Sequence, residues 1–164
     1  MTAALLRLAL RTQTPGDNDF LARLYASTRS EELRHTGWTD SEKQTFLDQQ
    51  FRAQTLHYEN FYRGATRAIV LFEDKPAGRL YLFQMNNDLR IVDISLLSEY
   101  RGRGIGTALL RGILERAQAT GSKVSIHVEI FNPAKRLYER LGFVPAAPEG
   151  VYLLMEWRPE RPIN

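Results

Sequence analysis

The spacing of hydrophobic side chains changes several times along the chain, and each change marks a predicted element. Leucines alternate with other residues over 6–10, which predicts a first strand. After a TPGD turn, apolar residues on one face predict a helix over 18–28. The capping-box pair Thr39 and Glu42 begins a second predicted helix that runs to about residue 58. The first third of the chain is therefore predicted to be a strand followed by two helices.

Short apolar runs with the alternation of strands dominate the rest of the chain. TRAIVLFED and AGRLYLFQM, joined by a turn at Asp74 and Lys75, predict a β-hairpin. The other predicted elements are strands at 89–97, 123–130 and 151–157, a helix that carries Ala108 to Ala117 and ends at Gly121, and a helix at 133–141. The strand–helix–strand unit from Leu89 to Ile130 requires a parallel crossover, whereas the hairpin is antiparallel. The sequence therefore predicts an α/β domain on a mixed sheet.

The length and composition of the chain fit one globular domain. Its 164 residues leave little room for a second core, so we expect one domain over 1–158 and a frayed tail at 159–164. A net charge of +3 without any run of Lys or Arg makes nucleic acid an unlikely partner. The apolar run at the N-terminus is interrupted by Arg7 and fits a strand better than a signal peptide, and no run reaches the ~20 residues that span a bilayer. We expect a cytoplasmic protein that does not bind membranes.

The stretch EYRGRGIGTALLRG, residues 99–112, places four glycines and three arginines between a predicted strand and a predicted helix. The first N–H groups of a helix lack internal partners and carry partial positive charge, and glycines let an anion approach the backbone. A P-loop spacing is absent, and the dinucleotide fingerprint G-x-G-x-x-G fails because Thr107 and Leu109 stand at its last glycine. The stretch is therefore either another kind of anion-binding turn or a flexible, soluble turn.

The order Arg101-x-x-Gly104-x-Gly106 resembles the signature of the GNAT superfamily of acyl-CoA-dependent N-acyltransferases, Arg/Gln-x-x-Gly-x-Gly/Ala after the fourth strand. A second region, NPAKRLYERLGF from Asn132 to Phe143, is similar to the closing motif of that family. The resemblance covers nearly the whole chain and is weakest before the predicted hairpin. It implies a GNAT-like mixed β-sheet of about seven strands flanked by about four helices, with residues 1–158 as a single N-acetyltransferase domain.

The same resemblance implies acetyl-CoA as the acyl donor and no metal. At the end of the fourth strand, main-chain groups of Leu96 and Leu97 would pair with pantetheine and polarise the thioester carbonyl. Asn132, after the fifth strand, is also assigned to donor binding. The backbone of seven further residues would hold the pyrophosphate: Arg101, Gly102, Arg103, Gly104, Ile105, Gly106 and Thr107. Whether the two arginine side chains add charge or point to solvent is left open.

The implied reaction is direct attack of an amine on the thioester within a ternary complex. Because the chain has no cysteine, a cysteinyl acyl-enzyme is excluded. The resemblance makes Tyr138 the general acid that protonates the departing thiolate, and the alternative is a tyrosine packed against Leu137 and Leu141. Asp93 and Glu129 are the candidate bases, since burial among apolar neighbours would make Asp93 a better proton acceptor. Asp93 can equally be a paired structural acid, with water carrying the proton.

The acceptor is less defined than the donor. Gln50, Gln54 and His57 follow one another at steps of four and three, so they share a helix face that can line an acceptor pocket. An ordinary amphipathic face and a homodimer contact are the alternatives. A small-molecule amine is slightly favoured over a protein amine. Two other functions stay open, a catalytically silent acyl-CoA-binding regulatory module of the same fold and a basic protein that associates with nucleic acid.

Overall fold

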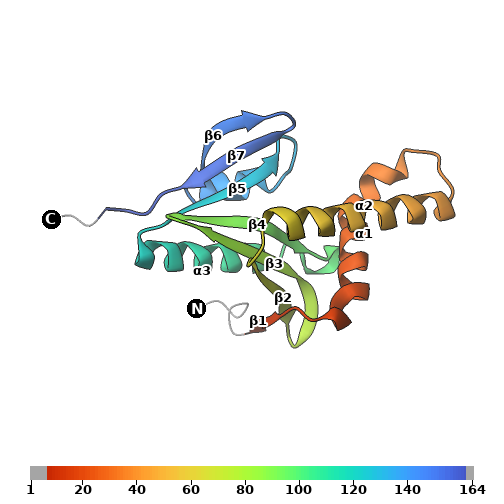
Figure 1. Ribbon diagram of the computed structural model, residues 1–164, viewed down its shortest axis with the longest axis horizontal. Coiled ribbons are helices and arrows are strands. Elements are labelled where there is room, and N and C mark those ends of the chain that lie inside the picture. Colours follow the sequence, from red (N-terminus) through yellow and green to blue (C-terminus); the bar gives the residue numbers. More distant parts are fainter. Residues whose placement is uncertain (1–6, 162–164) are drawn as a thin grey trace.

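A computed structural model describes residues 7–161 of the chain, whose strands form a single seven-stranded mixed sheet (Figure 1). The strands are β1 (Leu8–Thr12), β2 (Thr66–Phe72), β3 (Lys75–Met85), β4 (Asp88–Leu96), β5 (Lys123–Glu129), β6 (Val144–Glu149) and β7 (Tyr152–Trp157). The helices are α1 (Asn18–Arg34), α2 (Asp40–Phe61), α3 (Ile105–Thr120) and α4 (Lys135–Arg140), with the 3-10 turns η2 (Pro15–Asp17) and η3 (Ser98–Tyr100). The α/β fold expected from the sequence, with about seven strands and four helices, is confirmed.

The strand order is β1-β2-β3-β4-β5-β7-β6. Strands β1 to β4 form an antiparallel meander, and α3 carries the chain from β4 to the parallel strand β5. The antiparallel pair β6 and β7 completes the sheet on the other side of β5. The sequence analysis located no strand at β6, because Pro145 and Pro148 interrupt its strand pattern. Prolines are tolerated there because β6 is an edge strand, and they discourage pairing with another chain.

Both ends of the chain reach beyond the described residues. The first six residues of the stretch considered as a signal peptide, and the first residue of the predicted first strand, lie in residues 1–6, outside the part that the structure describes. The predicted frayed tail ends in residues 162–164, which also lie outside it. Within the described part of that tail, the Glu160 backbone exchanges two hydrogen bonds with the Gln118 side chain on α3, at 2.9 and 3.0 Å.

Helices α1 and α2 are longer than their predicted ranges, although their starting points agree. The Thr39 side chain accepts a hydrogen bond from the Glu42 N–H at 3.2 Å, so the predicted capping box is confirmed. Helix α1 continues through SEELR to Arg34, where the ion pairs Arg29–Glu32 and Glu31–Arg34 bridge successive turns. These charged pairs favour the helical conformation that the apolar pattern alone did not predict.

The two faces of the sheet are covered by different helices (Figure 1). Helix α3 packs on one face through Ile105, Leu109, Leu110, Ile113 and Ala117, which belong to the main hydrophobic core. Helix α1 packs on the other face through Phe20, Leu21 and Leu24, in a second core that includes Ile69 and Leu97. Helix α2 lies on the α1 side and has no buried residue over its described length. Hydrophobic burial therefore fixes α1 and α3 but contributes little to the docking of α2.

A β-bulge in β4 decides which side chains face which helix. The register runs Leu82↔Ile91 and then Tyr81↔Asp93, so Val92 is an extra residue in β4. Ile91 belongs to the α3-side core, whereas Leu97 belongs to the α1-side core. Because side chains alternate along a strand, Asp93 would face the α3-side core if the bulge were absent. The bulge turns the Asp93 carboxylate toward α1 and α2 instead.

Glycine is required where β3 passes the end of β4. A Cβ at Gly78 would lie 2.1 Å from the Ser95 carbonyl oxygen and 2.8 Å from Leu96 Cδ2. Both distances are shorter than van der Waals contact, so any other residue would push the two strands apart. The close approach fixes the position of the last residues of β4, which matter for the site described below.

Asp17 ties β1 to the start of α1. Its carboxylate accepts two hydrogen bonds from Arg11, at 2.8 and 2.9 Å, and one from the Thr14 N–H at 2.8 Å. The Arg11 hydrogen bonds, against an opposing effect of burial, lower the pKa of Asp17 from 3.8 to about 2. The stabilisation is therefore fully present above pH 3.8 and is lost as the pH falls toward 2.

We expect Asp17→Asn to lower the free energy of unfolding at pH 7 by roughly 1–2 kcal/mol. The difference from the wild type should shrink as the pH falls below 4, because the Asp17 carboxylate of the unfolded state, with its pKa of 3.8, then takes up protons, whereas the native carboxylate does so only near pH 2. Urea unfolding followed by circular dichroism at pH 7 and pH 3 measures both effects. Asp19→Asn, on the exposed side of the same helical turn, is the matched control. An Asp17 variant as stable as the control at pH 7 would contradict this role of the ion pair.

Candidate active site

Strands β4 and β5 separate part of the way along their length. They are paired only from Asp88↔Lys123 to Ile91↔Ile126, although β4 continues to Leu96 and β5 to Glu129. The separation begins next to the Val92 bulge, because the extra residue bends β4 away from its parallel neighbour. The result is a wedge between two strands, with main-chain groups along both of its edges.

At the end of β4 the main-chain groups of two adjacent residues point in opposite directions. The Leu97 N–H donates to the Ala77 carbonyl oxygen at 2.8 Å, so this N–H is already used within the sheet. In an antiparallel ladder the neighbouring residue turns its N–H and C=O away from the partner strand. The Leu96 main chain therefore faces the wedge, while Leu97 contributes a buried side chain to the α1-side core. Of the two residues predicted to bind the donor here, Leu96 is the one with an available N–H.

The glycine-rich turn leads directly into the N-terminus of α3. Gly102 and Gly104 have φ angles of +72° and +80°, and Gly104 is the N-cap of the helix. These left-handed conformations favour glycine and fold the turn back over the helix end. The first intrahelical bond runs from the Ala108 N–H to the Gly104 carbonyl, and within residues 7–161 the N–H groups of 105–107 have no acceptor. The predicted cluster of backbone donors is thus formed next to the wedge.

Both arginines of the turn have contacts within the protein. Arg101 Nε donates to the Leu96 carbonyl oxygen at 3.1 Å, which links the turn to the end of β4. The Arg103 guanidinium lies over the rings of Tyr100 and Phe72, 5.7 and 5.9 Å from their centroids. Their charge is next to the proposed anion site, but neither side chain reaches the helix N-terminus through a recorded hydrogen bond in the described chain.

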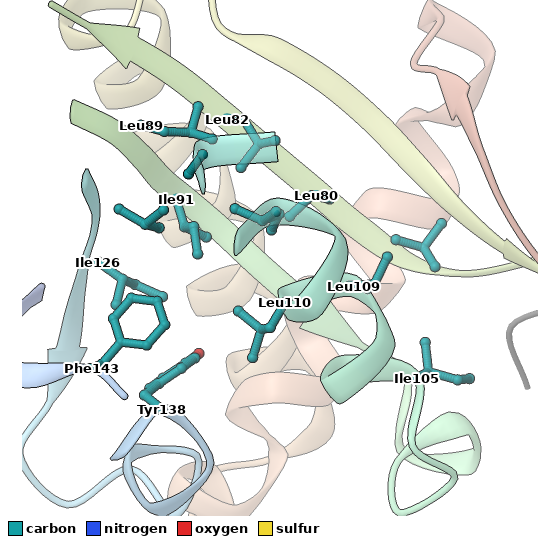
Figure 2. Close-up of a cluster of buried hydrophobic side chains, with 14 of the residues drawn as sticks. Leu80, Leu82, Leu89, Ile91, Ile105, Leu109, Leu110, Ile126, Tyr138 and Phe143 are labelled. Carbon is teal, nitrogen blue, oxygen red and sulfur yellow. The ribbon is translucent and has the colours of Figure 1, made fainter. Parts of the chain in front are cut away.

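Tyr138 lies on α4 and is only 5% exposed, with its ring packed edge-on against Phe143 at 5.7 Å. In Figure 2 its hydroxyl points away from α4 and toward the buried cluster that includes Leu110. Burial, with a smaller effect from the negative charge of Asp93, raises the pKa of Tyr138 to about 12. The hydroxyl is therefore protonated at neutral pH and is able to donate a proton or a hydrogen bond.

Asn132 precedes α4 and shapes the turn that leads to Tyr138. Its side-chain oxygen accepts from the Ala134 N–H at 2.9 Å, and its own N–H donates to the Glu129 carbonyl at 2.9 Å. The Asn132 side chain thereby forms an Asx-type turn of the kind that often precedes a helix. Donor binding by Asn132, as expected from the sequence, would use the backbone of this turn.

The prediction that the Asp93 carboxylate lies among apolar side chains is wrong. The carboxylate forms an ion pair with Arg79 at 2.6 Å, and both side chains are nearly buried. Tyr58 donates to Oδ2 at 2.8 Å and Ser95 donates to Oδ1 at 2.9 Å. The bulge at Val92 is the reason, because it turns Asp93 from the α3-side core toward these polar groups. The structure thus matches the alternative interpretation of Asp93 as a paired acid.

Arg79 connects this carboxylate to α2. Its guanidinium also donates to Gln54 Oε1 at 2.5 Å and lies 5.1 and 5.7 Å from the ring centroids of Tyr81 and Tyr58. We call Gln54, Tyr58, Arg79 and Asp93 the polar clamp. Sequence analysis missed Arg79, although an arginine inside the apolar run AGRLYLFQM is a signal of a buried charged partner.

Of the three residues predicted to line the acceptor side, only Gln54 faces the sheet. Gln50 and His57 are exposed, and the His57 ring stacks on Phe61 at 4.7 Å. The inward face of α2 is centred on Phe51, Gln54 and Tyr58, one step further round the helix than the predicted face. The structure therefore does not bring Gln50, Gln54 and His57 together around one pocket.

On the far side of the wedge, β5 presents His127 and Glu129 to the α1 side. His127 Nδ1 lies 3.2 Å from Arg90 and Nε2 lies 3.2 Å from Glu149. Since a guanidinium only donates, Nδ1 accepts and Nε2 carries the proton in the neutral ring. Glu129 is exposed. Burial lowers the pKa of the Arg29 guanidinium on α1, but the larger combined effect of Tyr25, Glu32 and Glu129 raises it above its ordinary value.

The described residues contain neither a candidate metal-binding cluster nor a candidate membrane-spanning helix. No group of three or more His, Cys, Asp or Glu side chains is arranged to hold a metal ion among residues 7–161. In the same part of the chain, no helix combines the length and the apolar character needed to cross a membrane.

Comparison with known proteins places these features in a family. Residues 22–143 match the acetyltransferase (GNAT) family. A mycothiol acetyltransferase of Corynebacterium aurimucosum is 42% identical over 74 residues, which cover 43% of this chain and 21% of that protein. One from Corynebacterium glutamicum is 46% identical over 61 residues, covering 36% of this chain and 21% of that protein. The chain therefore aligns with only about a fifth of the length of these relatives.

Solved structures agree on the fold across nearly the whole chain. The PaiA N-acetyltransferase from Thermoplasma acidophilum, in complex with coenzyme A, superposes with a TM-score of 0.68 at 15% identity, covering 92% of this chain and 98% of that one. An acetyltransferase from Thermus thermophilus gives a TM-score of 0.68 at 20% identity, covering 94% and 99%. At these identities the likeness concerns the fold alone.

Proposed function

We propose, from the premise that the chain belongs to the acetyltransferase (GNAT) family, that it transfers an acetyl group from acetyl-CoA to a primary amine in a ternary complex. The observation that carries the proposal is the wedge between β4 and β5, with the Leu96 main chain on one edge and the N-terminus of α3 beside it. Tyr138 supplies a protonated hydroxyl from α4. These are the groups that an acyl-CoA thioester needs for binding and for departure of the thiol.

The residues of the wedge fit the donor by their chemistry. The N–H groups of 105–107 and the backbone of the glycine turn suit a pyrophosphate, since helix N-termini bind anions. The Leu96 N–H is positioned to polarise a thioester carbonyl, a contact that strengthens as negative charge develops on the oxygen. Acetyl-CoA is a substrate in this scheme, and the protein contributes orientation and hydrogen bonds.

The proposed steps follow from which side chains can accept or donate a proton. The amine, with a pKa of about 10.4 if it resembles lysine, must first lose a proton. Its nitrogen then forms a bond to the carbonyl carbon, the carbon–sulfur bond breaks, and the Tyr138 hydroxyl protonates the thiolate. The new amide nitrogen loses its second proton to solvent, and the tyrosinate takes up a proton from solvent. Because Asp93 is committed to Arg79, Tyr58 and Ser95, we assign the amine proton to Glu129 or to water.

A thiol-release assay tests the proposal. Purified protein is mixed with acetyl-CoA and a panel of primary amines, and free coenzyme A is measured with a thiol reagent. The chain itself has no cysteine, so the protein adds no background signal. Amine-dependent release supports the enzyme. Tight coenzyme A binding in calorimetry without amine-dependent release would instead identify a catalytically silent regulatory module.

The arginines of the turn are expected to matter less than its backbone. Both Arg101 and Arg103 are exposed, and exposed charges contribute about 1 kcal/mol or less, which is a factor of about five in affinity. We therefore expect Arg101→Ala and Arg103→Ala each to weaken coenzyme A binding by no more than about fivefold. Titration calorimetry measures the change, and Arg111→Ala on the following helix is the control. A much larger loss of affinity would show that a guanidinium binds the phosphates directly.

A further inference from the structure

Helix α4, which carries Tyr138, is too short to be stable by itself. It spans only Lys135–Arg140, and helices of this length are marginal in water without other support. The ring of Tyr138 packs edge-on against Phe143, but its hydroxyl has no recorded hydrogen bond within residues 7–161. The direction in which the hydroxyl points (Figure 2) is therefore set by the packing of the ring and by the backbone of α4.

Two successive hydrogen bonds link the Asn132 side chain to the backbone of Tyr138. The Asn132 Oδ1 atom accepts from the Ala134 N–H at 2.9 Å. The Ala134 carbonyl oxygen in turn accepts from the Tyr138 N–H at 3.1 Å. The Asn132 carbonyl oxygen also accepts from the Lys135 N–H at 3.1 Å. Asn132 thus supplies the acceptors for the first two N–H groups at the entry to α4.

The sequence Asn132-Pro133 explains why a side chain has to supply one of these acceptors. Proline has no N–H and disfavours a helical backbone in the residue before it, so Asn132 stays outside the helix. The N–H groups at the start of a helix have no main-chain acceptor within it. An asparagine oxygen two residues earlier reaches the Ala134 N–H, as in the turns that Asn and Asp favour. Only the oxygen of the Asn132 amide is used, and its NH2 group has no recorded hydrogen bond in the described chain.

We propose that Asn132 is a positioning residue for the general acid: its side-chain oxygen fixes the entry to α4 and thereby the direction of the Tyr138 hydroxyl. The inference rests on the proposed function, in which Tyr138 protonates the departing thiolate. It gives the Asn132 side chain a role other than the donor binding expected from the sequence. The two roles differ in the atoms they use, because positioning needs only an oxygen acceptor and no NH2 group.

Asn132→Ala and Asn132→Asp, each made in the wild type and in the Tyr138→Phe variant, provide the kinetic test. Aspartate keeps an oxygen acceptor and alanine has none. Since loss of such a cap typically shifts a helix equilibrium by about fivefold, we expect Asn132→Ala to lower kcat by about that factor. The affinity for coenzyme A should stay within about twofold of the wild type, and Asn132→Asp should keep at least about half of kcat.

The Tyr138→Phe background shows whether Asn132 acts through the hydroxyl. With the hydroxyl already absent, Asn132→Ala should have little further effect on kcat, because residues that act as a unit are not additive. Thr39→Ala, which removes the side-chain cap of α2, is the matched control. Its effect on kcat should be the same with and without the Tyr138 hydroxyl.

Amide hydrogen exchange, followed by NMR without any substrate, gives a readout that does not depend on turnover. The Tyr138 N–H should exchange about fivefold faster in Asn132→Ala, because its acceptor Ala134 is no longer held. The exchange rate should be close to that of the wild type in Asn132→Asp and in Thr39→Ala. An unchanged rate in Asn132→Ala would contradict the link from Asn132 to Tyr138.

The outcomes separate this proposal from the proposed function. If Asn132→Ala and Asn132→Asp both weaken coenzyme A binding more than about fivefold, the amide itself binds the donor and the positioning role is wrong. An equal loss of kcat with and without the Tyr138 hydroxyl would also overturn it, while leaving acetyl transfer intact. No amine-dependent release of coenzyme A by the wild type would overturn acetyl transfer itself. In that case hydrogen exchange still decides whether Asn132 fixes the backbone of Tyr138.

Discussion

Replacement of Tyr138 by phenylalanine is expected to lower kcat by more than tenfold and to leave KM for acetyl-CoA nearly unchanged. The ring is buried and packs against Phe143, and phenylalanine preserves this packing. Only the hydroxyl is lost, and with it the proton for the departing thiolate. General acids typically contribute 10² or more to a rate, but a thiolate of pKa near 8.5 is already a tolerable leaving group, so activity is reduced and not abolished.

Steady-state kinetics against acetyl-CoA and a saturating amine measure the effect of Tyr138→Phe. Tyr62→Phe removes a hydroxyl from a ring that packs on Phe83, outside the wedge, and is expected to leave kcat unchanged. Since the pKa of Tyr138 is about 12, the wild-type rate should show no decline from ionisation of this tyrosine below about pH 10. Unchanged turnover in the Tyr138 variant would remove this residue from the chemistry and leave it a packing role.

The fold and the position of the N-terminus of α3 are predictable from the sequence because local patterns determine them. The strand–glycine turn–helix order fixes where the N–H groups of 105–107 lie, whatever the rest of the chain does. Alternation along the strands identifies the sheet for the same reason. These features depend on residues that are close in sequence, so the pattern along the chain is enough to indicate them.

The acceptor side could not be predicted because it depends on a bulge and on a helix rotation. Strict alternation along β4 places Asp93 in the apolar core, and the extra residue Val92 reverses this. On α2, either the face centred on Gln50 or the face centred on Phe51 could pack on the sheet. The hydrogen bond from Arg79 to Gln54 favours the second face, and these two residues are 25 positions apart in the sequence. No local pattern reports a register shift or a contact between such distant residues. The polar clamp therefore becomes visible only in three dimensions.

The clamp has a consequence for the role of Asp93. Helix α2 has no buried residue along its described length, so its C-terminal half is held on the sheet by Gln54 and Tyr58 through Arg79 and Asp93. Burial, together with the charge of Asp93, raises the pKa of Tyr58, so its hydroxyl stays protonated and donates to the carboxylate. Asp93 is thus positioned to hold one wall of the acceptor side, whereas a general base would need an unshared oxygen.

Asp93→Asn alone is expected to destabilise the protein by about 3 kcal/mol or more, because it leaves the Arg79 charge buried without a counter-ion. Arg79→Gln alone should do the same, by leaving Asp93 unpaired. The double variant Arg79→Gln/Asp93→Asn replaces the ion pair by two neutral amides that can still hydrogen-bond to each other. Its loss should be smaller than the sum of the single losses, with a coupling energy of about 1 kcal/mol or more. Urea unfolding of the four proteins measures this coupling.

Activity of the same four proteins decides what Asp93 does. If Asp93 positions α2, the double variant regains most of the turnover that Asp93→Asn loses, and the remaining defect lies in KM for the amine. Asp88→Asn, which alters another carboxylate on the same strand outside the clamp, is the control for a charge change on β4. If the double variant regains stability but stays as inactive as Asp93→Asn, the carboxylate takes part in proton transfer. In that case the ion pair with Arg79 would have to open during the reaction.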